Sequence, residues 1–122
     1  MAAEVPRFIL AGGLSTGLHW ALMAGLIALG VPAVLATAVG AAAGLLANYF
    51  LQRSFTFRSA KRHRSAFPSY LGSAGLGWCI NLLVFSAAYS TLFSVVTAQF
   101  VATAAAALAN YYVMKRYVFQ PA

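Results

Sequence analysis

Apolar residues fill this chain in two long tracts that contain no acidic or basic side chain. The first tract covers residues 8–52 and the second covers residues 65–114. A bilayer core about 30 Å thick takes ~20 apolar residues per helix, so each tract is long enough for two spans and a short turn. The pattern therefore predicts an all-α membrane protein with four transmembrane helices, at residues 8–29, 31–51, 70–90 and 93–114.

The turn inside each tract is read from its local residues. Gly30, Val31 and Pro32 interrupt the first tract. Glycine permits a tight turn and proline favours the start of a helix, so this break is well marked. The break in the second tract, at residues 90–92, has only serine and threonine as turn-forming residues.

The eight basic residues all fall at one side of the predicted spans. Arg7 precedes the first span, and Lys115 and Arg116 follow the fourth. The remaining five lie between spans two and three, namely Arg53, Arg58, Lys61, Arg62 and Arg64. Because cytoplasmic segments are enriched in lysine and arginine, we expect both termini and the central basic loop, residues 53–68, to be cytoplasmic.

Composition excludes several classes of protein. Charged residues make up 7% of the chain and apolar residues 62%, whereas a soluble domain has about a quarter charged. Glu4 is the one acidic residue and Cys79 the one cysteine, so carboxylate-pair chemistry and an internal disulfide are excluded. The sequence contains no phosphate-binding loop and no metal-ligand spacing. We expect no enzymatic activity, no cofactor and no metal.

The length is that of a single domain, residues 1–122, and the chain is internally duplicated. A shift of 62 positions aligns residues 7–57 with residues 69–119, and the strongest block pairs residues 46–49 with residues 108–111. Each copy is predicted to be a helical hairpin. An even number of spans per copy makes the two hairpins parallel, related by an axis along the membrane normal.

The residues at the ends of the hairpins resemble those of the GtrA-like family of four-span membrane proteins. The opening pattern Arg-Phe-x-x-x-Gly-Gly occurs once, at residues 7–13, and Ser69 stands where a second arginine would be expected. The closing pattern, Asn-Tyr-x-x-x-basic followed by aromatic residues, occurs at residues 48–57 and 110–119. The second copy has Lys115 in place of arginine and an additional Arg116.

The resemblance implies a role in cell-surface polysaccharide synthesis at the bacterial inner membrane. Members of the family are proposed to move polyprenyl-phosphate-linked sugars from the cytoplasmic to the outer leaflet. The alternative is a membrane anchor for a polyprenyl-phosphate glycosyltransferase. A small multidrug transporter is disfavoured because the spans contain no carboxylate. We expect a lipid-linked sugar and anionic lipids as partners and a homodimer as the assembly. The net charge of +7 fits an anionic leaflet better than nucleic acid.

Two groups of residues are candidates for binding such a lipid. Cations at headgroup depth would contact the phosphate: Arg53, Lys115, Arg116 and Arg7. Polar and aromatic residues further in would contact the sugar or form a polar path: Asn48, Asn110, Tyr49, Tyr111, His19 and Asn81. Each has an ordinary alternative. Cations at helix ends contact lipid headgroups, tyrosines form the interfacial belt, and buried amides form hydrogen bonds between hairpins. For His19 the alternative is a neutral ring bonded to a backbone carbonyl.

Overall fold

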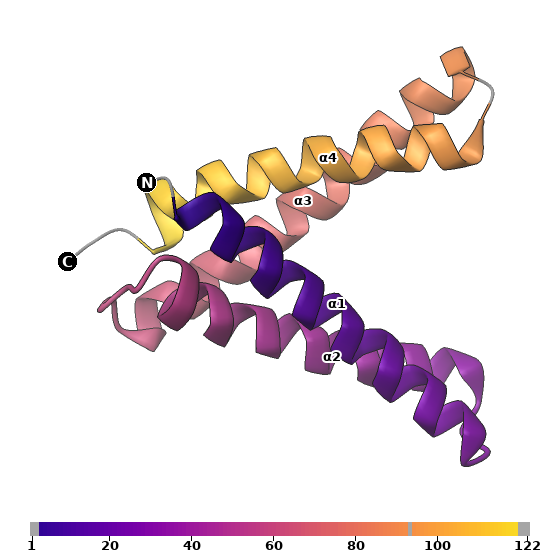
Figure 1. Ribbon diagram of the computed structural model, residues 1–122, viewed down its shortest axis with the longest axis horizontal. Helices are drawn as coiled ribbons and strands as arrows, with labels where there is room; N and C mark the ends of the chain where they lie inside the picture. Colours follow the sequence, from indigo (N-terminus) through magenta and orange to yellow (C-terminus); the bar gives the residue numbers. More distant parts are fainter. Residues whose placement is uncertain (1–2, 93, 120–122) are drawn as a thin grey trace. The chain divides into compact units, whose positions relative to one another are not determined.

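The computed structural model describes residues 3–92 and 94–119, and these residues are almost entirely helical (Figure 1). Four long helices follow one another along the chain, two of which continue directly into a short π-helical turn. In chain order the elements are α1 (Glu4–Ala28), α2 (Ala33–Leu51), η1 (Gln52–Thr56), α3 (His63–Leu92), α4 (Val95–Val113) and η2 (Met114–Val118). The described residues contain no strand, as the sequence predicts.

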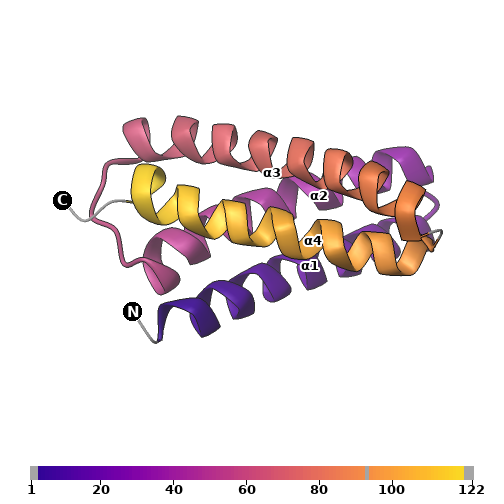
Figure 2. The same cartoon turned by 90° about the horizontal axis from the view of Figure 1, so that it is seen from above.

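The chain forms two compact units, Met1–Ser59 and Ala60–Ala122. Unit 1 contains α1, α2 and η1, and unit 2 contains α3, α4 and η2. Each unit is a hairpin of two long helices lying side by side (Figures 1 and 2). We call the end of each hairpin opposite its turn the open end. The corresponding elements α2 and α4, and η1 and η2, begin and end 62 residues apart.

The turn of unit 1 is formed by the residues that the sequence marks. Gly30 has a φ of +92°, a conformation that side chains other than glycine rarely adopt. Pro32 precedes the first turn of α2 with a φ of −56°. In unit 2, α3 ends at Leu92 and the hydroxyl of Ser94 accepts a 3.3 Å bond from the Thr97 N–H, which caps α4. The predicted start of the fourth span, Phe93, lies outside the described residues.

Three helical segments are long and apolar enough to cross a membrane: Glu4–Ala28, Ala33–Thr56 and His63–Thr91. The chain is therefore a membrane protein. Helix α4 is not among the three, because Gln99, Asn110 and adjacent tyrosines lower its mean hydropathy. Membrane crossing by α4 stays a prediction from the spacing of the charged residues.

Helix α3 begins earlier than the sequence predicts, at His63 instead of residue 70. The N–H groups of Ser65 and Ala66 both donate to the Arg62 carbonyl, at 3.0 and 2.8 Å, and so form its first turn. Pro68 lies inside this helix. Proline has no N–H, so the backbone hydrogen bond to the Arg64 carbonyl is missing from the second turn of α3. Part of the predicted basic loop is consequently helical.

Helices α1 and α2 approach closely at two glycines. A Cβ atom added at Gly40 would lie 2.7 Å from the carbonyl oxygen of His19. One added at Gly44 would lie 3.0 Å from the carbonyl oxygen of Ser15. Ala102, which aligns with Gly40 in the duplication, is fully buried in unit 2. These small residues let the helix backbones pack directly against each other.

Candidate functional site

The basic residues of the repeated motif occupy equivalent places in the two π-helical turns. Arg53 is the second residue of η1 and Lys115 the second residue of η2, and both are half-buried. The turns are closed by i→i−5 bonds, from Phe57 N–H to the Gln52 carbonyl at 2.9 Å and from Phe119 N–H to the Met114 carbonyl at 2.7 Å. Such turns are rare and occur frequently at functional sites.

The aromatic neighbours of these cations differ between the units. In unit 2 the Lys115 ammonium lies 5.7 Å from the centroid of the Tyr111 ring, a cation–π contact. In unit 1 the Tyr49 ring is 1% exposed and packs edge-on against Phe50, with 5.2 Å between centroids. Tyr111 therefore lies beside a cation as the sequence predicts, and Tyr49, whose ring lies in the core of its hairpin, also interacts electrostatically with Arg53.

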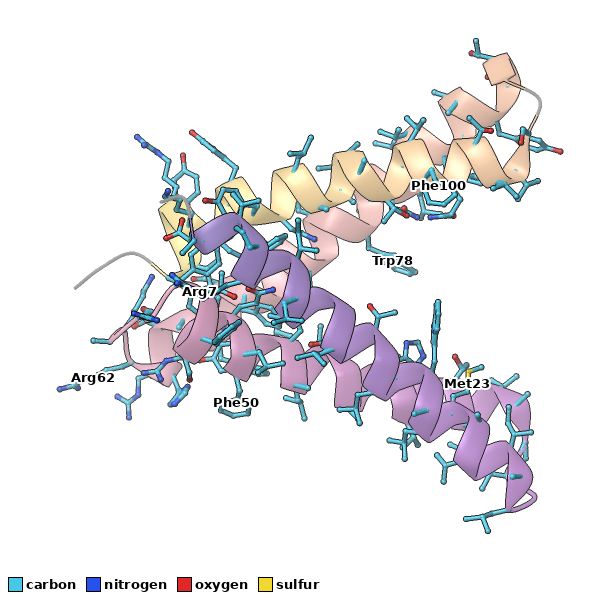
Figure 3. All side chains as sticks on the ribbon, in the orientation of Figure 1. Arg7, Met23, Phe50, Arg62, Trp78 and Phe100 are labelled. Carbon is cyan, nitrogen blue, oxygen red and sulfur yellow. The ribbon has the colours of Figure 1, made fainter. Side chains whose placement is uncertain are left out.

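Arg7 lies in the second turn of α1, at the open end of unit 1 (Figure 3). Its Nη2 atom donates to the Thr56 carbonyl at 3.2 Å, which joins α1 to η1. Arg116, the remaining candidate cation, is exposed. Arg7 is thus a predicted phosphate ligand whose position is held by a contact between two elements of its unit.

The two asparagines of the motif form hydrogen bonds inside their own hairpins. The Oδ1 atom of Asn48 accepts from Gln52 Nε2 at 3.0 Å, and the same nitrogen donates to the Phe8 carbonyl at 3.3 Å. The Oδ1 atom of Asn110 accepts from the Ser73 hydroxyl at 3.3 Å. These bonds lie within a hairpin, and the expected bonds between hairpins stay a prediction.

Gly77 is the reason that Asn110 reaches α3. A Cβ atom added at Gly77 would lie 2.6 Å from Oδ1 of Asn110, so the amide packs directly on the α3 backbone. The residue that aligns with Gly77 in unit 1 is Ser15, whose hydroxyl donates to the Ala11 carbonyl at 2.8 Å. The two asparagines therefore have different surroundings despite their identical motif.

A polar pair joins the two helices of each hairpin near the middle of the spans. In unit 1, His19 Nε2 lies 3.4 Å from the Thr37 hydroxyl. In unit 2, Gln99 Nε2 donates to Asn81 Oδ1 at 3.2 Å and to the Thr103 hydroxyl at 2.8 Å. The partners His19 and Asn81 are 62 residues apart, as are Thr37 and Gln99. The ring of His19 thus contacts a side chain and not the backbone carbonyl of its ordinary alternative.

These polar pairs lie on surfaces that their own unit leaves partly open. His19 and Asn81 are half-buried, and Thr37 and Gln99 are exposed. Large aromatic side chains nearby are also uncovered, and Trp78 and Phe100 project away from α3 and α4 (Figure 3). Apolar groups are stable in lipid, but an exposed amide is not, so the polar surface needs a polar neighbour.

Two functional candidates were missed by sequence reasoning. Gln52 is 1% exposed and bonds both α1 and Asn48, and Thr56 is fully buried beside Arg7. We call Arg7, Gln52 and Thr56 the junction cluster. Gln52 and Thr56 both lie inside the repeated motif, but the aligned positions of unit 2 hold Met114 and Val118. The departure from the repeat was the signal that could have identified them.

Comparison with known proteins agrees with the motif. A family model described as GtrA/DPMS, transmembrane domain, matches residues 7–119. The match includes both hairpins and all ten candidate residues, and it confirms the resemblance seen in the sequence. Neither the search of curated proteins nor the search of solved structures gives a match. In residues 3–92 and 94–119, no three histidine, cysteine or acidic side chains are grouped so that they could hold a metal.

Proposed function

The chain belongs to the GtrA/DPMS transmembrane-domain family, and we propose that it moves a polyprenyl-phosphate-linked sugar from the cytoplasmic to the outer leaflet of the inner membrane. The observation that carries this proposal is the pair of polar contacts, His19 with Thr37 and Asn81 with Gln99, at equivalent depths in the two hairpins. A sugar crossing the bilayer needs hydrogen-bonding groups inside the hydrocarbon region, and a simple anchor does not.

The depth of these contacts supports the proposal. His19 follows Phe8 by 11 residues, which is roughly 17 Å along a helix at 1.5 Å per residue, or about half of a 30 Å core. Polar groups at that depth cost several kcal/mol when they face lipid, and they mark substrate pathways in membrane proteins. We assign these four residues to a path for the sugar.

The ends of the hairpins supply the other half of the mechanism. Arginine and lysine in η1 and η2 lie where a phosphate at the inner leaflet would be, and arginine can hold a phosphate through two donors. We propose that both hairpins are oriented in parallel with termini in the cytoplasm, so that loading is cytoplasmic. Four spans enclose little space for a sugar, so we propose a homodimer as the transporting unit.

Reconstitution tests the proposal directly. Purified protein is inserted into vesicles that contain a labelled polyprenyl-phosphate sugar, and the fraction of label reaching the opposite leaflet is measured over time. We expect transfer with the native chain and at least tenfold slower transfer for His19→Leu and Asn81→Leu. The matched control is Trp20→Leu, next to His19 but 65% exposed and apolar. No transfer by the native chain, in vesicles where a known lipid scramblase works, would refute the proposal.

The anchor remains the second candidate because of the exposed cations Arg58, Arg62 and Arg64 between the hairpins. Such a basic surface fits headgroups and an acidic partner equally well. The two functions differ in their response to the mid-span variants. An anchor would keep supporting glycosyltransferase activity in cells when His19 and Asn81 are replaced by leucine, whereas a translocator would not deliver sugar to the outer surface.

A further inference from the structure

Three buried polar atoms of the junction cluster have no hydrogen-bond partner. They are Nε of Arg7, Oε1 of Gln52 and Oγ1 of Thr56. Gln52 is 1% exposed and Thr56 is fully buried, so bulk water does not reach these two side chains. Native proteins pair almost all such atoms, since an unpaired buried polar atom lowers the stability of the folded state. A cluster of three at one junction indicates that something else completes it.

The hydrogen bonds that Gln52 and Arg7 form determine which of their polar atoms remain without a partner. Gln52 donates two hydrogen bonds through Nε2, one to the Phe8 carbonyl and one to Asn48 Oδ1. The amide is therefore oriented with Oε1 as the unsatisfied acceptor. Arg7 bonds the Thr56 carbonyl through Nη2, which leaves the Nε–H as an unsatisfied cationic donor.

The leftover groups define the chemistry of their complement. The Nε–H of Arg7 needs an acceptor and, because the guanidinium is charged, favours an anionic oxygen. Oε1 of Gln52 needs a donor, and the hydroxyl of Thr56 takes either role. A phosphodiester alone supplies only acceptors. A group that carries an anionic oxygen and a hydroxyl close together satisfies all three atoms.

We propose that the junction cluster of unit 1 binds the sugar-phosphate linkage of the lipid. A phosphate oxygen accepts from Arg7, and a hydroxyl of the adjoining sugar donates to Gln52. This inference rests on the proposed function and deepens it, because it assigns recognition of the sugar end to one hairpin. It also separates this site from Arg53 and Lys115, which contact phosphate without selecting for a sugar.

Unit 2 has no counterpart of this cluster. The aligned positions hold Ser69, Met114 and Val118, of which the last two are 2% and 1% exposed. An aromatic pair is common to both open ends, Tyr70 with Phe119 at 6.4 Å between centroids in unit 2 and Phe8 with Phe57 at 6.3 Å in unit 1. The open ends therefore differ at two positions of the junction cluster, where unit 1 has the unpaired polar atoms of Gln52 and Thr56 and unit 2 has the apolar side chains of Met114 and Val118, although both ends carry the same motif.

The junction also has the means to open for a ligand. Two hydrogen bonds that join α1 to η1 are long, 3.2 Å from Arg7 to the Thr56 carbonyl and 3.3 Å from Gln52 to the Phe8 carbonyl. Long hydrogen bonds are weak ones. The free energy gained when a ligand pairs all three unpaired atoms would exceed the free energy lost when these two hydrogen bonds break.

The test replaces the cluster by its unit 2 equivalents, in the double variant Gln52→Met, Thr56→Val. The full-length protein is placed in phosphatidylcholine nanodiscs, and binding of a polyprenyl-phosphate-linked sugar is titrated. We expect Kd to rise at least tenfold, since hydrogen bonds to the linkage are removed. The double variant removes two unpaired polar atoms but also the two hydrogen bonds of Gln52 Nε2, so Tm is measured to show that the variant is folded. The matched control Thr56→Ser keeps the hydroxyl and should bind within about twofold of the native chain.

Three further probes identify what is recognised: the same polyprenyl phosphate without a sugar, phosphatidylglycerol, and inorganic phosphate. The native chain should prefer the sugar-linked lipid over all three, and the double variant should lose that preference. Equal binding of the native and double-variant proteins would overturn the inference and leave a buried water as the occupant. Translocation by a double variant with unchanged binding would reject this site while the proposed function stands. A native chain that shows the sugar preference without translocation would reject the function while the site stands.

Discussion

At the scale of single residues, close contact between helix backbones depends on which glycines lack space for a side chain. Gly40 and Gly44 face α1 with no room for a Cβ atom, whereas nothing lies within 4 Å of the Cβ position at Gly13 or Gly17. All four are spaced as pairs of small residues in the sequence. Of these two pairs, only Gly40 and Gly44 form a close contact between the helices of their own hairpin.

The residue-scale prediction compares two glycine-to-alanine changes. Gly40→Ala places a methyl group 2.7 Å from a backbone oxygen, so the helices must separate. We expect a loss of about 1–3 kcal/mol in the free energy of unfolding, as for other overpacked sites. Gly17→Ala adds the same methyl group in open space and should keep the native Tm or exceed it. Thermal unfolding in detergent measures both, and equal Tm values for the two variants would contradict the packing described.

At the scale of elements, α4 differs from the other three helices in its polarity. It is the helix that falls short as a membrane span by composition, and Gln99, its fifth residue, bonds Asn81 and Thr103. Interhelical hydrogen bonds in membranes are worth about 0.6 kcal/mol on average. Such a bond does not offset the free energy cost of placing an amide in the hydrocarbon region, so Gln99 does not favour the stability of the helix pair.

The element-scale prediction concerns Gln99, because its hydrogen bond is worth less than the cost of its amide in the membrane. Gln99→Leu makes α4 more apolar, so we expect insertion of α4 to improve and Tm to stay the same or rise. Translocation of the lipid-linked sugar should fall at least tenfold because the polar path loses a member. Glycosylation-site mapping reports insertion, and the vesicle assay reports transfer. A variant that is less stable and fully active would contradict both expectations. Val101→Leu, on the same helix and already apolar, is the control.

At the scale of the whole molecule, the arrangement of charge around the two hairpins predicts one orientation in the membrane. All eight cations lie at the open ends or in the segment that connects the hairpins, and the turns have none. Because segments rich in lysine and arginine stay in the cytoplasm, this predicted orientation has both turns on the outer side of the membrane.

Cysteine accessibility tests the orientation. In a Cys79→Ala background, Leu29→Cys in the first turn should react with a membrane-impermeant thiol reagent added to intact cells, because Leu29 is 82% exposed. Arg62→Cys, in the exposed segment between hairpins, should react only after the membrane is opened. The two labelling patterns reversed would overturn the cytoplasmic placement of the termini.

Much of the fold was predictable because helix formation and membrane insertion respond to local hydropathy. The turn at Gly30 and Pro32 and the ends of α2 agree with expectation to within two residues. The start of α3 does not, because backbone bonds to Arg62 extend the helix past the apolar tract. Among the candidate residues, the sequence indicated Asn110 and Lys115, which form contacts inside unit 2, and missed Gln52, which depends on a contact with Phe8 that no local pattern encodes.

The amino-acid sequence alone determined the membrane class, the helical hairpins and the family, since hydropathy, charge and motif spacing are properties of residues near one another in the chain. Tertiary structure alone decided which polar atoms find partners. It paired His19 with Thr37 and left Gln52 Oε1 unpaired, and such outcomes depend on distances between helices that are far apart in sequence.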